Sequence, residues 1–228
     1  DKKKGEDWSQ AQYNFSINPN AQEEWANLGL TTQTAEMLQI GFENEGISFP
    51  VFIYGELLDV RNYKAGRKPK VITRRKAKTL LLPFDVWRED TRPTLLCAGE
   101  KDMAINRQMG FNAITFTGGE QAFPKLFKHS FKGKKVYIAY DNDQAGREGA
   151  RKVASLLKDA GAIPHVVTGH YEVCTEKGED MHDFYIKYRK TADDFRSILE
   201  STNEFGEEDH RTEQQKYIPL VTIEESTK

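Results

Sequence analysis

The sequence predicts an α/β fold in which helices cover a parallel sheet, preceded by a smaller α+β portion. From residue 94 onward, short apolar runs alternate with helix-like segments, which is the pattern of strand–helix–strand units. Before that point, two apolar runs separated by Gly55 and Glu56 have the spacing of a β-hairpin. With 228 residues, of which 38% are hydrophobic and 30% charged, the chain can bury a core in one or two domains.

The first part of the chain is expected to form the α+β unit. Residues 1–20 are polar with scattered aromatic side chains, which fits either an ordered arm or a linker. Residues 21–30 have helical character, and a run of threonines offers a cap for a second helix at 35–40. The predicted hairpin follows at 47–60, and its outgoing strand leads directly to Arg61.

The second part is expected to form the parallel sheet. The predicted strands are residues 94–98, 113–116, 136–140 and 165–168. Helices are expected at residues 100–109, after the glycine pair at 118 and 119, from 145 to 160, and at 192–199. The helix at 145–160 has apolar residues at i, i+3, i+4 and i+7, from Ala150 to Leu157, which is the stripe of a helix packed on a sheet.

Charge is unevenly distributed along the chain. The formal net charge is only -2, yet residues 64–78 contain eight Lys or Arg residues and no acid. Such a run is either a solvated surface or a segment that binds nucleic-acid phosphates. Gly66 and Pro69 within the run oppose a regular helix, so a loop is expected there.

Composition also bears on the compartment. No run approaches the ~18 apolar residues of a membrane span, and no apolar signal core follows the charged start. Two cysteines, Cys97 and Cys174, are too few for a disulfide framework or a self-contained zinc site. We therefore expect a cytoplasmic protein with no membrane partner.

Acidic residues follow the predicted strand at 136–140. Asp141 and Asp143 are two residues apart, so on an extended chain their carboxylates project to the same side. Ligands of parallel sheets bind beyond the carboxyl ends of the strands, and carboxylate oxygens suit Mg²⁺. The alternative is that Asp143 only caps the following helix while Asp141 is solvated.

Several motifs resemble the TOPRIM domain of DNA primases of the DnaG type and of the phage and plasmid primase–helicase type. The motifs are residues 95–102, 110–114, the glycine pair 118–119, and 136–146 with its Asp-x-Asp-x-Ala-Gly element. Residues 177–183 are similar to the Lys-x-Asp-x-x-Asp element of phage and plasmid primases, and residues 28–30, 40–42, 47–50 and 68–70 are similar to the segment that precedes TOPRIM.

The resemblance implies a TOPRIM-type, Rossmann-like parallel sheet at residues 91–190. It implies a primase-like subdomain with the basic segment at 21–90, an arm or linker at 1–20, and a C-terminal helix with a charged tail at 191–228. The implied activity is metal-dependent RNA primer synthesis on single-stranded DNA, with nucleoside triphosphates as substrates and Mg²⁺ or Mn²⁺ as cofactor. A helicase domain or subunit is the implied partner.

The resemblance also assigns roles to individual residues. Asp141 and Asp143 would bind the metal, and Asp180 or Asp183 would support a second ion. The residues expected to contact template or nucleotide phosphates are Arg61, Lys70, Arg74, Arg75, Lys76, Lys101 and Arg147. Lys101 and Asp102 open a helix, where solvated first-turn residues are the competing interpretation.

One departure from the family concerns catalysis. TOPRIM enzymes usually carry a Glu immediately before the Gly of the first loop, where this chain has Ala98. Three explanations are open: Glu100 takes over the role, the Glu was removed by engineering, or the domain has kept only binding. The last explanation leads to the alternative function, a catalytically weakened TOPRIM module that binds single-stranded DNA for an attached replicative helicase. A TOPRIM nuclease or topoisomerase component is a third class, which the upstream segment fits less well.

Overall fold

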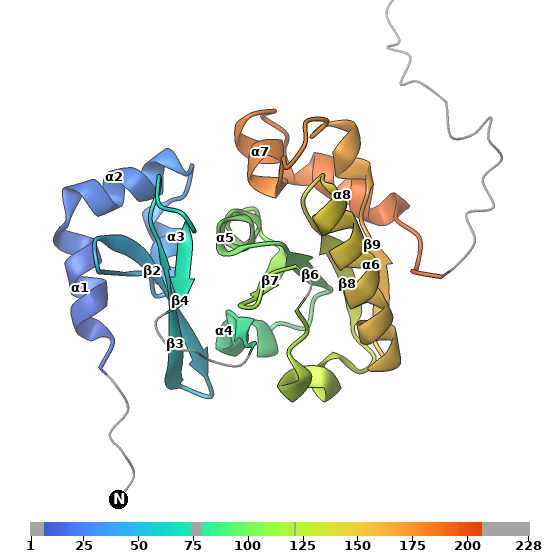
Figure 1. Ribbon diagram of the computed structural model, residues 1–228, viewed down its shortest axis with the longest axis horizontal. Helices are drawn as coiled ribbons and strands as arrows, with labels where there is room; N and C mark the ends of the chain where they lie inside the picture. Colours follow the sequence, from blue (N-terminus) through green and yellow to red (C-terminus); the bar gives the residue numbers. More distant parts are fainter. Residues whose placement is uncertain (1–6, 74–78, 121, 207–228) are drawn as a thin grey trace, which may run out of the picture.

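The computed structural model describes residues 7–73, 79–120 and 122–206. Within these ranges the chain forms two sheets that lie side by side, one of four strands and one of five (Figure 1). None of the helices in the described ranges is long and apolar enough to cross a membrane.

The first sheet is an antiparallel meander. Its strands, in the order β1-β2-β3-β4, are β1 (Gly41–Glu43), β2 (Gly46–Ile53), β3 (Glu56–Tyr63) and β4 (Val71–Thr73). The predicted hairpin is confirmed: β2 and β3 pair, and Tyr54 and Gly55 both adopt positive φ in the turn between them. Part of the basic segment lies in β4, which pairs with β3.

Three helices accompany this sheet: α1 (Ser9–Ile17), α2 (Pro19–Asn27) and α3 (Thr32–Met37). The helix predicted at 21–30 is confirmed but begins earlier, because the Asn18 side chain caps it and Pro19 occupies its first turn. Thr31 caps α3 as expected, by accepting the backbone N–H of Thr34. In the described part of residues 1–20, α1 follows Trp8, which is buried and donates to the carbonyl of Gln39 at 2.7 Å.

The second sheet has the order β5-β7-β6-β8-β9. Its parallel strands are β6 (Thr94–Cys97), β7 (Asn112–Phe116), β8 (Lys135–Ala139) and β9 (Ile163–Val166). The four predicted parallel strands are therefore confirmed, although β9 begins two residues before the expected position. The sequence did not predict β5 (Leu81–Leu82), a short antiparallel strand at the edge that pairs with β7.

The helices of this part are α4 (Phe84–Arg88), α5 (Glu100–Gln108), α6 (Gln144–Asp159), α7 (Met181–Ile186) and α8 (Ala192–Ser201). Two 3₁₀ helices, η1 (Lys125–Phe131) and η2 (Gly169–Glu172), complete it. The α-helix expected after the glycine pair is wrong in type and position. The chain instead forms η1, which begins only after Pro124 and buries Phe127 and Phe131. The prolyl ring cannot donate a helical hydrogen bond, so the helix cannot extend back through it.

One hydrophobic core joins the two sheets. A single cluster of buried side chains runs from Phe15 in α1 to Leu199 in α8 and includes residues of both sheets. The apolar stripe of α6 is fully buried, as its spacing predicts. Helix α5 lies between the sheets (Figure 1), and the loop from β6 leads directly into it.

Candidate metal centre

The centre lies where β6 and β8 end. These strands are parallel neighbours, and their last residues, Cys97 and Ala139, are paired. The loops that follow therefore leave the same edge of the sheet. One leads through Ala98 and Gly99 into α5, and the other leads through Asp141 into α6.

Three carboxylates from separate segments meet at this edge. Asp102 comes from the first turn of α5, Asp141 from the loop after β8, and Asp180 from the start of α7. One carboxylate oxygen of each lies within 4.8 Å of the corresponding atoms of the other two. Oxygen ligands at this mutual spacing are what a hard divalent cation requires.

The protein leaves this group of carboxylates incompletely satisfied. The backbone N–H of His182 donates to Asp102 Oδ1 at 3.1 Å, and Lys101 Nζ lies 2.8 Å from Asp180 Oδ2. Asp141 Oδ1, however, is buried and has no hydrogen-bond partner. A buried, unpartnered carboxylate oxygen is costly, so its presence here is explained if a cation normally contacts it.

The titration of the carboxyls agrees with this excess of negative charge. The pKa of Asp141 is raised to about 8, mainly by burial and further by the nearby carboxylates of Glu120, Asp180 and Asp143. Burial and the charge of Asp180 raise the pKa of Asp102 well above its usual range. Burial also acts to raise the pKa of Asp180, but the Lys101 ammonium outweighs it and the pKa is lowered. The donor set therefore fits Mg²⁺ or Mn²⁺, which would replace protons at these oxygens.

Asp143 is placed differently from Asp141. Its side chain caps α6 by accepting the backbone N–H of Gly146 at 2.8 Å, which is the structural role considered as an alternative. Asp141 is not the solvated residue of that alternative. Asp143 lies outside the three-carboxylate group, although its charge reaches Asp141, so its metal-binding role stays a prediction.

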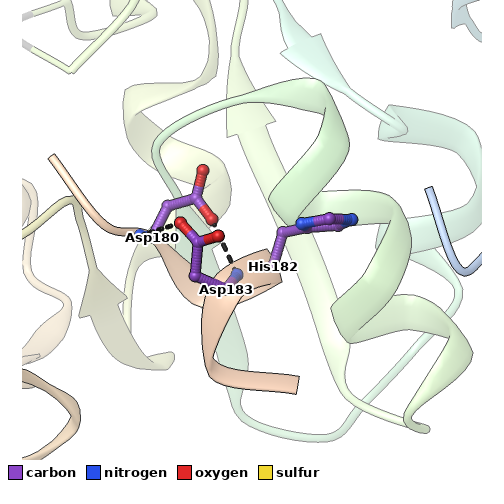
Figure 2. Close-up of side chains that lie close together, drawn as sticks. All are labelled: Asp180, His182 and Asp183. Carbon is purple, nitrogen blue, oxygen red and sulfur yellow. Dashed lines mark hydrogen bonds between the residues drawn. The ribbon is translucent and has the colours of Figure 1, made fainter. Parts of the chain in front are cut away.

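Asp180 and Asp183 belong to a second close group, with His182. Figure 2 shows the two carboxylates at the first turn of α7, where each accepts the backbone N–H of the other residue in a reciprocal capping box. His182 Nε2 lies 2.9 Å from the carbonyl oxygen of Leu28. Helix capping therefore accounts for Asp183, and Asp180 is the member that both groups share.

Glu100 is directed to another partner. Its carboxylate is buried and lies 2.6 Å from Arg61 Nε, on β3 of the first sheet. Among the described residues, neither close group of possible metal ligands includes Glu100. The structure thus brings Asp141 and Asp180 together with Asp102, and it places Glu100 in an ion pair between the two sheets.

The predicted phosphate-binding residues occupy several settings. Arg61 and Lys101 are engaged by Glu100 and Asp180, and Lys70 is exposed. Arg147 donates to the Asn142 side chain and lies over the Tyr171 ring. Arg74, Arg75 and Lys76 lie outside the described residues.

Asp102 is not the solvated first-turn residue that its place in the sequence favours, since only 5% of its surface is exposed. Asp102 and Asn106 are spaced i, i+4 and so share one face of the helix, but two polar residues at this spacing give no sequence signal of burial. Asn106 is fully buried and donates to the Asp102 carbonyl, which shows that this face packs inward.

The comparisons with known proteins bear on both the domain and the fold. Residues 97–185 match the family model described as Toprim-like. The catalytic core of DnaG superposes with a TM-score of 0.70 at 17% identity, over 86% of this chain and 77% of that one. The zinc-binding and RNA polymerase domains of the Aquifex aeolicus primase give 0.71 at 17% identity, over 86% of this chain. The primase fragment of the bacteriophage T7 primase-helicase gives 0.56 at 13% identity, over 77% of this chain and 72% of that one.

The carboxylate-lined sheet edge at residues 97–185 therefore belongs to a TOPRIM domain. With the smaller unit that precedes it, the chain has the fold of a primase catalytic core, as the sequence motifs led us to expect. The chain spans 59% of the length of the Aquifex aeolicus chain that it matches. Comparison with curated protein sequences gives no match.

Proposed function

We propose that this chain is the catalytic core of a DNA primase, which synthesises RNA primers on single-stranded DNA with Mg²⁺ or Mn²⁺. The observation that carries the proposal is the meeting of Asp102, Asp141 and Asp180 at the carboxyl edge of the TOPRIM sheet. The primase folds on which the chain superposes support the choice among the activities of TOPRIM proteins.

In this proposal the three carboxylates hold the divalent ion. Asp141 has the buried oxygen without a partner, Asp102 is fixed by the N–H of His182, and Asp180 is balanced by Lys101. The bound ion would orient a nucleoside triphosphate and offset charge on the transferred phosphoryl group. Asp143 contributes by fixing the start of α6, and its negative charge strengthens the attraction for the cation.

Cationic side chains near this edge are proposed to contact phosphates. Lys101 is paired with Asp180, and Arg147 donates to the side chain of Asn142, the residue after Asp141. Lys70 is exposed, and Arg74, Arg75 and Lys76 follow it in the basic segment, outside the described residues. Such contacts position a strand without reading its sequence. Arg61 would first have to leave Glu100. The proposed partners are template DNA, nucleoside triphosphates and a helicase, the last by analogy with the bacteriophage T7 primase-helicase.

A second candidate is the DNA-binding module without synthesis. Ala98 favours it, because this position carries a Glu in most TOPRIM enzymes and a methyl group offers no ligand and no proton. In that case the basic segment and the fold would be retained while the chemistry was lost.

Primer extension on single-stranded DNA distinguishes the two candidates. The chain is compared with Asp141→Asn and with Asp159→Asn, a matched control because Asp159 is an exposed carboxylate at the end of α6. We expect metal-dependent synthesis by the chain and by the control, and a loss of about a hundredfold or more in Asp141→Asn. Salt-sensitive DNA binding by all three proteins, with no synthesis by any, would support the second candidate instead.

A further inference from the structure

A further carboxylate, that of Glu120, lies in the loop after β7. In the sheet, β6 lies between β7 and β8. The chain leaves β7 through a tight turn, in which the N–H of Gly119 donates to the Phe116 carbonyl, and arrives at Glu120. The end of β6 therefore lies between the ends of β7 and β8, and the first residue after β6 is Ala98.

Two glycines of α6 place Glu120 beside Asp141. A Cβ atom on Gly146 would lie 2.4 Å from the carbonyl oxygen of Asp141. One on Gly149 would lie 2.8 Å from the carbonyl oxygen of Glu120 and 3.2 Å from its Cβ. Residues i and i+3 are neighbours on the same helical face, so the backbones that rest on them are neighbours too. Glu120 and Asp141 are thus docked side by side on the first two turns of α6.

Both carboxylates carry an oxygen that the protein leaves unsatisfied. Among the side chains that the structure describes, Glu120 Oε1 and Asp141 Oδ1 are the two carboxylate oxygens that are buried without a hydrogen-bond partner. Because the backbones of both residues rest on neighbouring turns of α6, the two unsatisfied oxygens belong to the same part of the site. A buried carboxylate oxygen without a hydrogen-bond partner is costly unless a cation contacts it.

We propose that Glu120 supplies the carboxylate that position 98 lacks, and that it is a ligand of the divalent ion together with Asp141. The inference rests on the proposed function. Ala98 has no carboxylate, and the carboxylate of Glu120 comes from the loop after the neighbouring strand β7. Like Glu100, Glu120 lies outside both close groups of possible ligands among the described residues. It differs in that its Oε1 is buried without a partner, whereas Glu100 is held by Arg61.

The test is a titration with Mn²⁺, in which the free ion is followed by electron paramagnetic resonance, so that the readout does not depend on synthesis. We expect Glu120→Gln to weaken Mn²⁺ binding about tenfold or more. The matched control is Glu148→Gln, an exposed residue of α6 next to Gly149, which should bind as the unaltered chain does. The double variant A98E/E120Q should recover most of the affinity, because it returns a carboxylate to the end of β6.

The outcomes separate this inference from the proposed function. If Asp141→Asn no longer binds Mn²⁺ while Glu120→Gln binds it with unchanged affinity, Glu120 is not a ligand and the proposed metal site is retained. If the unaltered chain binds no Mn²⁺, both proposals fail. Thermal unfolding without metal controls for folding, and a melting temperature lowered by Glu120→Gln with unchanged affinity would overturn the inference. Should Glu120→Gln not fold, Glu120→Asp replaces it, with the same weakening expected because the carboxylate is drawn back by one methylene.

Discussion

At Asp141, burial and neighbouring carboxylates act in the same direction. Both raise the pKa, to about 8, and leave the side chain protonated near neutrality in the absence of metal. Burial and the charge of Asp180 also raise the pKa of Asp102, whereas the Lys101 ammonium lowers the pKa of Asp180. A divalent cation that binds here must therefore displace protons, which couples metal affinity to pH.

This coupling predicts how the stability of the metal-free protein changes with pH. A carboxyl whose pKa is raised from 3.8 to about 8 on folding contributes stability below pH 3.8 that is lost as the pH rises to about 8. We expect the free energy of unfolding to decline over this interval, as measured by urea unfolding at a series of pH values. Asp141→Asn should flatten the decline, and Mg²⁺ should restore stability at the alkaline end.

The control for this experiment is Asp159→Asn, which changes an exposed carboxylate on α6. Its stability should follow the pH dependence of the unaltered chain. An equal decline in Asp141→Asn would show that the carboxyl of Asp141 is not protonated in the folded, metal-free protein.

Among the elements, α6 positions the site through its first turns. Asp143 caps the helix, and Gly146 and Gly149 let the backbones of Asp141 and Glu120 rest directly on it. Helix propensity alone would favour Ala over Gly by about 1 kcal/mol in a helix interior. The close approach outweighs that preference, because a Cβ at Gly146 would meet three backbone atoms of Asp141.

We therefore predict that Gly146→Ala destabilises the protein despite its better helix propensity. The expected loss is about 1–3 kcal/mol in the free energy of unfolding, as for other overpacked sites, with weaker Mn²⁺ binding because Asp141 is displaced. Lys152→Ala, on the exposed side of the same helix, should change the stability by less than about 0.5 kcal/mol. A more stable Gly146→Ala protein with unchanged Mn²⁺ affinity would contradict this account of α6.

Between the two sheets, the Arg61–Glu100 ion pair links the smaller unit to the TOPRIM domain. Both side chains are largely buried, with 15% and 7% of their surfaces exposed. Removing one member of a buried pair leaves the other charge without compensation, which costs about 3–5 kcal/mol. The shared hydrophobic core supplies the rest of the connection.

Glu100→Gln is accordingly predicted to destabilise the fold by a few kcal/mol while leaving Mn²⁺ affinity unchanged, provided that the protein is kept below its melting temperature. Urea unfolding and the Mn²⁺ titration measure the two quantities separately. Arg61→Met combined with Glu100→Met should recover part of the stability, since no charge is left alone. If Glu100→Gln lost Mn²⁺ binding while its free energy of unfolding stayed unchanged, Glu100 would be a metal ligand and not a structural ion-pair partner.

Local patterns were enough to predict most elements of this chain. The parallel strands, the hairpin, the cap at Thr31 and the buried stripe of α6 depend on neighbours within a few residues, so the sequence contains them directly. The TOPRIM motifs were recognisable for the same reason, because each lies within a short run of the chain.

What only the tertiary structure decided is which distant residues converge. Asp102 joins Asp141 and Asp180 because β6 and β8 are neighbours and because the face of α5 that carries Asp102 points inward. Glu100, two residues earlier, is directed toward Arg61, since side chains two positions apart on a helix point about 200° apart. The edge strand β5 and the approach of Glu120 depend likewise on strand order and helix packing, which bring together residues whose separation in sequence carries no local signal.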